Sequence, residues 1–155
     1  MKVAVITISD RASRGDYEDL SGREIEREVR ARYPSAEVSR TVVPDEAGDI
    51  LSALESHAGA DFILTTGGTG LSPRDVTPEV TMRFCAKEVP GIAEALRAQS
   101  YAETPAAMLS RGFAGIRGTT VVVNFPGAPQ AVRSCMRVLG PVMDHALRMI
   151  RAEGH

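Results

Sequence analysis

The sequence predicts one α/β domain of three layers, in which helices cover both faces of a mostly parallel sheet that contains one antiparallel strand. Three observations support this prediction. Segments typical of strands and of helices alternate along the chain, and no linker divides residues 1–155. The first apolar run, at residues 3–8, is continuous, as expected for a strand covered on both faces. Two later strand-like runs are joined by the short link Arg117-Gly118, which predicts an antiparallel hairpin.

The first half of the chain contains three predicted strands and two predicted helices. The segment Ser21-Gly22-Arg23-Glu24 has the pattern of a capping box, so we expect a helix to begin there and to end before Pro34. Asp45 can cap a second helix, which Gly59 ends. The strands of this half are expected at residues 3–8, 36–43 and 61–66.

The second half begins with a strong helix start at Thr77-Pro78-Glu79. Threonine can serve as the N-cap there, proline fits the first helical position, and a carboxylate follows in the first turn. Helical sequence continues to about Leu109, and the two hairpin strands are expected at residues 113–116 and 119–124. The chain ends in an apolar-striped helical region that we expect Gly140-Pro141 to break.

The composition of the chain argues against several classes of function. The formal net charge is −2, and contents of 43% hydrophobic and 25% charged residues are ordinary for a globular protein. A nucleic-acid partner is not expected, because arginines alternate with glutamates and tryptophan is absent. No run approaches the roughly 18 apolar residues of a membrane span. The chain enters a strand at once, without a signal-peptide cleavage site, so we expect a cytoplasmic protein.

The cysteines and histidines do not predict a metal centre. Cys85 and Cys135 lie 50 residues apart in helical patterns and form no CxxC pair, so we expect buried thiols. His57 is expected at a helix end and His145 inside a helix, whereas His155 is the last residue.

The most informative segment is TTGGTGLSPRDVTPE, at residues 65–79. Gly67, Gly68 and Gly70 remove side chains that would keep a ligand from the backbone, and successive N–H groups in such a turn can bind an anion. Asp75 follows closely, so the segment predicts a phosphate site. It is neither a P-loop, which needs a lysine after the glycines, nor a dinucleotide fingerprint, which follows the first strand. The alternative is a tight turn in which Asp75 and Thr77 have only structural roles.

Four polar loops follow predicted strands. In open parallel sheets, ligands bind outside the carboxyl ends of the strands. We therefore expect these loops to meet at one edge of the sheet and to form the site. They are Ser9-Asp10, Pro44-Asp45, residues 67–75, and Asn124-Phe125-Pro126-Gly127.

Several ungapped motifs, in the same order, resemble those of the molybdopterin adenylyltransferases of molybdenum cofactor biosynthesis. These are the bacterial MogA-type enzymes and the equivalent domain of plant and animal fusion proteins. The resemblance covers essentially the whole chain and implies that family's fold. Phe125 is a mild departure, since leucine or methionine is expected there. The matching segments are ITISDRAS at 6–13, VPDE at 43–46, residues 65–77, AMLSR at 107–111 and NFPG at 124–127.

The resemblance implies that the terminal phosphate of molybdopterin attacks the α-phosphate of Mg-ATP, giving adenylyl-molybdopterin and pyrophosphate. It identifies Asp45 and Asp75 as functional aspartates. We expect Asp75 to hold Mg²⁺ with the triphosphate and Asp45 to orient substrate, with the division of these tasks open. It also implies a homotrimer and hand-over of the product to a molybdenum-inserting MoeA-type protein. The residues expected to bind substrate are Ser9, Asp10, Gly67, Gly68, Thr69, Gly70, Ser110, Asn124, Pro126 and Gly127.

Other functions stay open at this point. A MoaB-type paralogue would bind molybdopterin with weak or no adenylyltransferase activity, although residues 9–13 and Asp45-Glu46 favour the MogA type. A pterin-binding scaffold would lack catalysis, and the presence of both Asp45 and Asp75 argues against it. A nucleotide pyrophosphatase of the competence-damage-like kind usually carries a further domain. The sequence does not distinguish a molybdenum pathway from a tungsten pathway.

Overall fold

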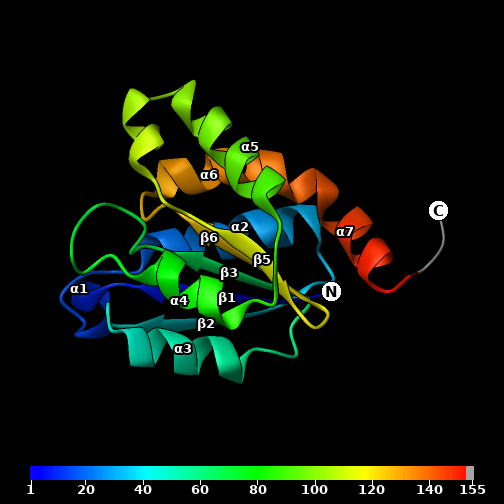
Figure 1. The fold of residues 1–155 in the computed structure, drawn as a ribbon, viewed down its shortest axis with the longest axis horizontal. Helices are drawn as coiled ribbons and strands as arrows, with labels where there is room; N and C mark the ends of the chain where they lie inside the picture. Colours follow the sequence, from blue (N-terminus) through cyan, green and yellow to red (C-terminus); the bar gives the residue numbers. More distant parts are fainter. Residues whose placement is uncertain (153–155) are drawn as a thin grey trace.

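A six-stranded sheet with the order β2-β1-β3-β6-β5-β4 forms the centre of the protein (Figure 1). The computed structural model describes residues 1–152. Strands β1, β2, β3 and β6 run parallel, and β5 runs antiparallel to both β6 and β4. The predicted sheet, mostly parallel with one antiparallel strand, is therefore confirmed. The strands are β1 (Lys2–Ile8), β2 (Glu37–Val43), β3 (Phe62–Thr66), β4 (Lys87–Glu88), β5 (Ala114–Arg117) and β6 (Thr120–Phe125).

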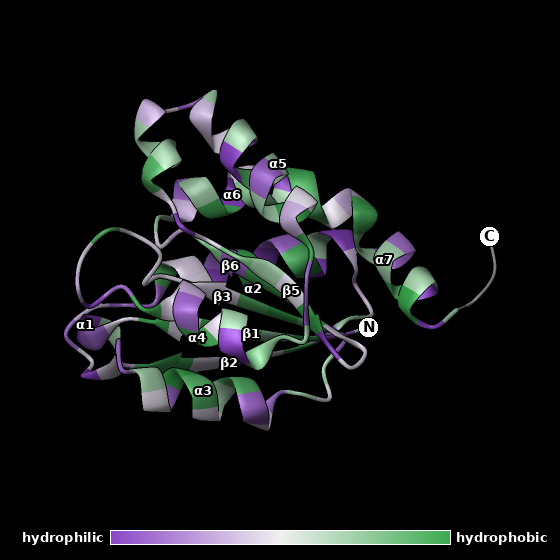
Figure 2. Cartoon of the chain, in the orientation of Figure 1, coloured by the Kyte–Doolittle hydropathy of each residue, from purple (hydrophilic) through white to green (hydrophobic). Residues whose placement is uncertain are grey.

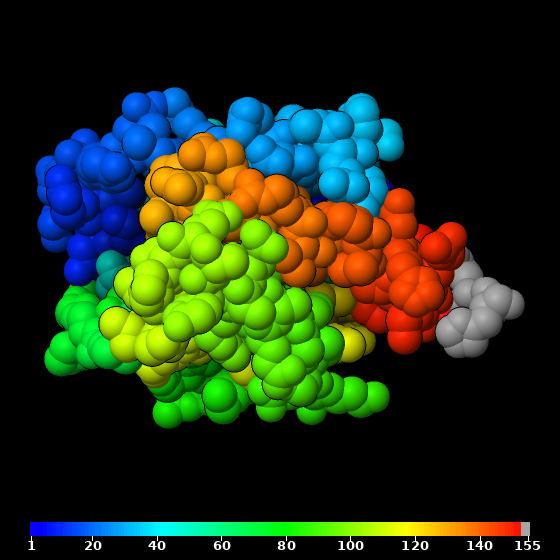
Figure 3. Space-filling model, turned by 90° about the horizontal axis from the view of Figure 1, so that it is seen from above, coloured from blue at the N-terminus to red at the C-terminus, as the bar shows by residue number. Residues whose placement is uncertain are grey.

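Helices cover both faces of the sheet and complete the three layers. On one face lie α2 (Leu20–Arg32), α5 (Pro90–Tyr101), α6 (Pro129–Leu139) and α7 (Met143–Ile150). Figure 3 looks onto this face and shows α6 between α2 and α5. The other face carries α3 (Ala47–Ser56) and α4 (Thr77–Phe84). No helix within residues 1–152 has the length and apolar character needed to cross a bilayer.

Successive side chains of a central strand point to opposite faces of the sheet, and this explains why the strand sequences are continuously apolar (Figure 2). Val3 and Val5 of β1 pack in the core under α2 and α6, whereas Ala4 and Ile6 pack in the core over α3 and α4. Each face of such a strand must be apolar, because each is covered by helices. The prediction for residues 3–8 is thus confirmed, with a start at Lys2.

Helix α2 begins differently from the prediction, because Asp19 and not Ser21 is its N-cap. Asp19 Oδ1 accepts hydrogen bonds from the Gly22 N–H at 2.8 Å and from Thr7 Oγ1 at 2.9 Å. Arg40 Nη1 donates to Asp19 Oδ2 at 3.2 Å. Ser21 lies buried inside the first turn. A carboxylate that accepts from three donors is held more firmly than a serine hydroxyl would be. The prediction of a capping box that begins at Ser21 is therefore wrong.

Two other predicted caps have different partners in the structure. Glu46 precedes α3, and the Asp45 side chain accepts from the Asp10 N–H at 2.8 Å instead of capping the helix. Thr77 is the first residue of α4, and its Oγ1 donates to the Gly67 carbonyl at 3.0 Å. Both side chains therefore connect loops that are distant in sequence. Helix α3 also ends at Ser56, before the expected Gly59.

Three short elements join these helices and strands. The one-turn helix α1 (Asp10–Ser13) follows β1, and Ser9 Oγ caps it by accepting from the Ala12 N–H at 3.2 Å. Segment η1 (Pro105–Leu109) follows α5, and η2 (Gly140–Val142) separates α6 from α7. The segment η2 confirms the predicted helix break at Gly140-Pro141. Neither α1 nor β4 was predicted, because each is too short to show a periodic pattern.

The cysteines are free thiols, as expected, and Cys135 is buried whereas Cys85 is part-buried. Burial raises the pKa of each thiol to about 11. His57 follows α3, with Nε2 3.1 Å from Thr41 Oγ1, and His145 lies within α7. His155 lies outside the described residues.

Asp19→Ala should lower the free energy of unfolding by about 2 kcal/mol, because it removes an N-cap and leaves Thr7 without its acceptor. Ser21→Ala, at the cap position that the sequence suggests, should have a much smaller effect. Urea denaturation of both variants measures the difference. A larger loss for Ser21→Ala would contradict the assignment of Asp19 as the cap.

Candidate active site

The loops at the carboxyl ends of β1, β2, β3 and β6 meet at one edge of the sheet, which we call the rim. The Ser9 N–H donates to the Val43 carbonyl at 2.9 Å, which joins the ends of β1 and β2. Thr66 Oγ1 donates to the Pro126 carbonyl at 2.7 Å, which joins the ends of β3 and β6. The predicted convergence of these loops is therefore confirmed.

Residues 67–75, the glycine loop, pass so close to neighbouring segments that side chains are excluded. Gly67 and Gly68 have φ of +97° and +64°, a region that favours glycine. A Cβ on Gly67 would collide with the Ile8 carbonyl oxygen, and one on Gly68 would collide with Thr77 Oγ1. The alternative interpretation of this segment as a tight turn is therefore correct in one respect, because these two glycines are needed to form the turn itself.

The glycine loop also presents a row of unused backbone donors. The Gly67 N–H donates to the Phe125 carbonyl at 3.2 Å. Among residues 1–152, the next three N–H groups, of Gly68, Thr69 and Gly70, donate to no protein acceptor. Partly buried N–H groups need an acceptor from solvent or from a ligand. Three such donors in succession can bind an anion.

Asp10 and Asp45 bridge two loops of the rim by reciprocal hydrogen bonds. The Asp10 N–H donates to Asp45 Oδ2 at 2.8 Å, and the Asp45 N–H donates to Asp10 Oδ1 at 3.0 Å. Arg74, in the glycine loop, donates from Nη2 to both Asp10 oxygens at 2.9 and 2.8 Å. Its Nη1 pairs with Glu46 at 2.6 Å. A single guanidinium therefore ties the glycine loop to the loops after β1 and β2.

These contacts shift the pKa values of the Asp10 and Asp45 carboxyl groups in opposite directions. The hydrogen bond from the Asp45 N–H, helped by Arg74, lowers the pKa of Asp10 below its ordinary 3.8. Partial burial raises the pKa of Asp45 above that value, and the nearby charges of Asp10 and Asp75 add to the effect. The Asp10 and Glu46 carboxylates raise the pKa of Arg74, which stays charged. The two carboxyl groups that bridge the rim therefore differ in their electrostatic environments.

Asp75 lies at the far end of the glycine loop. Its Oδ2 accepts from the Ser72 N–H at 2.8 Å, so the side chain does stabilise a local turn. A Cβ on Gly70 would lie 3.0 Å from Asp75 Oδ2, and one on Gly68 would lie 3.3 Å from Asp45 Oδ1. The two aspartates thus lie beside the glycines whose N–H groups are unused. Within residues 1–152, the Oδ1 atoms of Asp45 and Asp75 accept no protein hydrogen bond.

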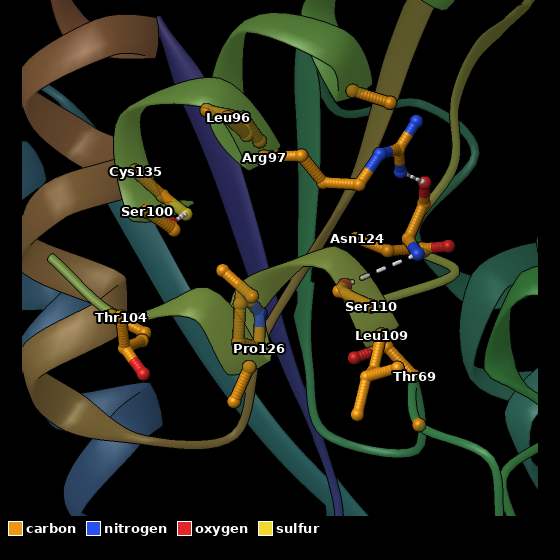
Figure 4. A pocket seen from close by; sticks show the side chains of 16 residues that line it. Thr69, Leu96, Arg97, Ser100, Thr104, Leu109, Ser110, Asn124, Pro126 and Cys135 are labelled. Atoms are coloured by element: carbon orange, nitrogen blue, oxygen red, sulfur yellow. Dashed lines mark hydrogen bonds between the residues drawn. The ribbon is translucent and has the colours of Figure 1, made fainter. Parts of the chain in front are cut away.

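A cavity of about 290 Å³ opens beside the glycine loop (Figure 4). Thr69 and Gly70 belong both to its wall and to the row of unused donors. Leu96 of α5, Leu109 of η1 and Pro126 contribute much of its apolar lining. Ser110 stands in the same wall, where its Oγ lies 3.3 Å from the Gly112 N–H. The cavity can therefore accommodate a small molecule that has both apolar and polar surfaces.

A second, smaller hollow of about 140 Å³ lies against the other side of the glycine loop. Ser9, Gly67 and Gly127 line it, together with Tyr17 and Leu20 at the start of α2. The segments 66–70 and 126–127 therefore form a ridge between two hollows. The sequence did not predict that α5 and η1 line the larger one, because their apolar residues have the pattern of core positions.

Asn124 is placed differently from the other residues expected to bind substrate. Its Oδ1 accepts from the Phe113 N–H at 3.1 Å, and its Nδ2 donates to Thr65 Oγ1 and Thr81 Oγ1, both at 2.9 Å. All amide groups of this buried side chain are engaged within the protein. Asn124 therefore supports the cavity wall by joining β6 to β3, α4 and the start of β5. Its role toward substrate stays a prediction.

The remaining predicted residues lie at the rim or in the cavity wall. Residues 67–70 and Gly127 belong to the ridge, Ser9 lines the smaller hollow, and Ser110 and Pro126 line the cavity. Asp45 and Asp75 lie beside Gly68 and Gly70, and Asp10 is hydrogen-bonded to Asp45. The sequence analysis assigned no role to Arg74 or to Arg111, although both lie in matching motifs. Arg111 donates from Nε to the Gly70 carbonyl at 2.7 Å. Within residues 1–152 there is no group of three or more His, Cys, Asp or Glu side chains arranged to hold a metal ion.

Replacing Gly67 separates steric exclusion from backbone strain. Gly118 has a similar φ of +59° but open space around its Cα, so Gly118→Ala should cost about 1 kcal/mol from strain alone. Gly67→Ala adds a collision with the Ile8 carbonyl and should cost clearly more. Chemical denaturation compares the two, with Gly59→Ala as a control that has neither feature. Equal losses for the first two variants would contradict the close approach at Gly67.

Comparison with known proteins assigns the family. Residues 4–145 match the family model described as "Probable molybdopterin binding domain". The chain is 39% identical over 153 residues to a molybdopterin adenylyltransferase of Helicobacter pylori, covering 96% of this chain and 86% of that protein. The structure of the molybdopterin biosynthesis enzyme MoaB from Thermus thermophilus superimposes with a TM-score of 0.88, at 41% identity, covering 96% and 95% of the two chains. A structure of MogA gives a TM-score of 0.91 at 38% identity, covering 97% and 99%. The chain therefore belongs to the family of probable molybdopterin binding domains.

Proposed function

We propose that this protein is a molybdopterin adenylyltransferase of molybdenum cofactor biosynthesis. The observation that carries the proposal is the row of unused N–H groups at Gly68, Thr69 and Gly70, which lies between Asp45 and Asp75 and borders the 290 Å³ cavity. Relatives similar over most of the chain, including the Helicobacter pylori protein, are molybdopterin adenylyltransferases, which supports the same activity here.

The proposed reaction joins two phosphate-bearing substrates. An oxygen of the terminal phosphate of molybdopterin forms a bond to the α-phosphorus of ATP. The bond between that phosphorus and the oxygen that bridges it to the β-phosphate breaks, and pyrophosphate leaves. Such a transfer needs alignment and charge stabilisation, and it needs no covalent bond to the protein. Backbone donors fixed in a tight turn supply both, because they need no reorganisation as charge develops.

The larger cavity is the proposed place for the pterin. Its lining is mostly apolar, and Ser110 and Thr69 contribute the hydroxyls needed to orient a ring with polar edges. A pterin there would direct its phosphate toward the N–H groups of Gly68 and Gly70. Gly67 can contribute no backbone donor, since its N–H is engaged with Phe125.

The two aspartates fit a role beside Mg²⁺ that accompanies ATP. Each has one oxygen held by a backbone N–H and a second oxygen, Oδ1, to which no donor of the described residues 1–152 is bonded. Mg²⁺ is usually held by one or two carboxylates together with substrate phosphates, so the free oxygen of Asp75 would suffice as the protein ligand. The ion would offset negative charge on the leaving pyrophosphate. We assign Asp75 to this task and Asp45 to orienting the substrate.

We also propose a homotrimer in the cytoplasm that passes its product to a molybdenum-inserting MoeA-type protein. The family resemblance supports these statements. Large apolar side chains, such as those of Met82 and Met108, are exposed on the described surface and are available for contacts between subunits. A MoaB-type protein with weak or no transferase activity is the alternative, and both MoaB and MogA structures resemble this chain closely. Asp45 and Asp75 beside the unused N–H groups favour the active enzyme.

Incubation with molybdopterin and Mg-ATP should yield adenylyl-molybdopterin and pyrophosphate, detected by chromatography and mass spectrometry. Asp75→Asn and Asp45→Asn should each lower the rate about 100-fold or more, because charge and orientation are lost at the reacting phosphates. Asp144→Asn, on α7, is a matched control that should retain the wild-type rate. Absence of product from the wild-type protein would contradict the proposed function. Full rates in both site variants would contradict only the assignment of the aspartates.

A further inference from the structure

One side chain outside the glycine loop contacts both ends of the segment 70–75. Arg111 donates from Nε to the Gly70 carbonyl at 2.7 Å and from Nη2 to the Asp75 carbonyl at 2.6 Å. Its Nη1 pairs with Glu79 in the first turn of α4. Its backbone N–H donates to the Thr69 carbonyl at 2.9 Å. Arg111 therefore contacts the loop and the helix that follows it at four points.

Arg74 ties the loop to Asp10 and Glu46 on one side, and Arg111 is its anchor on the side of the cavity. The internal hydrogen bonds of the loop, from the Ser72 N–H to Asp75 Oδ2 at 2.8 Å and from the Asp75 N–H to the Ser72 carbonyl at 2.9 Å, fix the shape of a turn. They do not fix where that turn lies relative to the cavity. A guanidinium is planar and holds its donors in a fixed geometry, so it can set the positions of several acceptors at once.

The position of Arg111 in the chain connects this support to the cavity. Its neighbour Ser110 stands in the cavity wall, as do Thr69 and Gly70. The backbone bond from Arg111 to Thr69 joins these two parts of the wall, and the side chain extends the connection to Asp75. A shift of Arg111 would therefore change the distance between the cavity and the Asp75 carboxylate.

We propose that Arg111 is a positioning residue, which holds the N–H groups of Gly68–Gly70 and the carboxylate of Asp75 in register with the cavity wall at Ser110. Its catalytic consequence rests on the proposed function, whereas its control of loop order does not. The ion pair with Glu79 is the lesser part of this arrangement. Half-exposed ion pairs contribute little to stability, and the carbonyl hydrogen bonds do not depend on Glu79.

The test compares Arg111→Lys with Arg117→Lys. Arg117 also donates to a backbone carbonyl, that of Phe84 at 3.1 Å, but it lies at the opposite end of β5 and α4. Lysine keeps the charge and loses the fork of donors. Arg111→Lys should lower kcat about 10- to 100-fold, since small displacements at a reacting centre have effects of that size. Arg117→Lys should keep the wild-type kcat, and the two melting temperatures should be similar. Glu79→Gln should have a much smaller effect on kcat than Arg111→Lys.

A double-mutant cycle separates positioning from general weakening. Because Arg111 acts partly through Asp75, Arg111→Lys should lower kcat by a smaller factor in the Asp75→Asn background than in the wild-type protein. Additive losses in the double variant would overturn the proposal. So would a kcat loss in Arg111→Lys that is fully matched by Arg117→Lys.

Hydrogen exchange gives a readout that does not require activity. The hydrogen-bonded amides of Ser72, Arg74 and Asp75, within residues 68–75, should exchange at least several-fold faster in Arg111→Lys than in wild type, and those of α2 should be unchanged. Unchanged exchange in residues 68–75 would overturn the proposal even if kcat falls. Faster exchange together with an inactive wild-type protein would instead uphold the positioning role and contradict the proposed function.

Discussion

The close approach of the backbone at Gly67 and Gly68 to Ile8 and Thr77 is the constraint on which the rest of the site depends. It joins the end of β3 to the end of β1 and to the start of α4, with no room for a side chain at either glycine. The Gly67 N–H donates to the Phe125 carbonyl, and in the part of the chain that the structure describes the next three N–H groups have no protein acceptor. The same packing that forms the turn therefore exposes the three donors that we propose to bind phosphate.

Charge at the rim follows from the loops that this turn brings together. Asp10, Asp45 and Asp75 come from three different loops, and Arg74 is paired with Asp10 and Glu46. Partial burial raises the pKa of Asp45, and the charges of Asp10 and Asp75 add to this effect. These carboxylates would repel a triphosphate that arrived without cations. Backbone donors beside carboxylates are thus an arrangement in which an anionic substrate and a divalent ion support each other. The ligand roles of these residues stay predictions.

Elements with a strong local pattern could be predicted from the sequence, and long-range side-chain contacts could not. Residues 3–8 showed their burial in β1 because both faces are apolar, and the rim followed from the rule that parallel strands end at one edge. The cap predicted at Ser21 was wrong because Asp19 caps the helix and is itself held by Thr7, which is distant in sequence. The cap predicted at Thr77 was wrong because its hydroxyl donates to the distant Gly67. The amide contacts of Asn124 and the carbonyl contacts of Arg111 likewise depend on elements that only the fold brings together.

The central claim is that the unused N–H groups of Gly68, Thr69 and Gly70 bind substrate phosphate. An NMR titration of the ¹⁵N-labelled protein with Mg-ATP, with and without molybdopterin, tests it most directly. We predict that the amide signals of these three residues shift as ligand binds, while those of Gly59 and Gly118, at the opposite end of the strands, stay unchanged. Saturable shifts at Gly59 or Gly118, with no change at residues 68–70, would contradict the account.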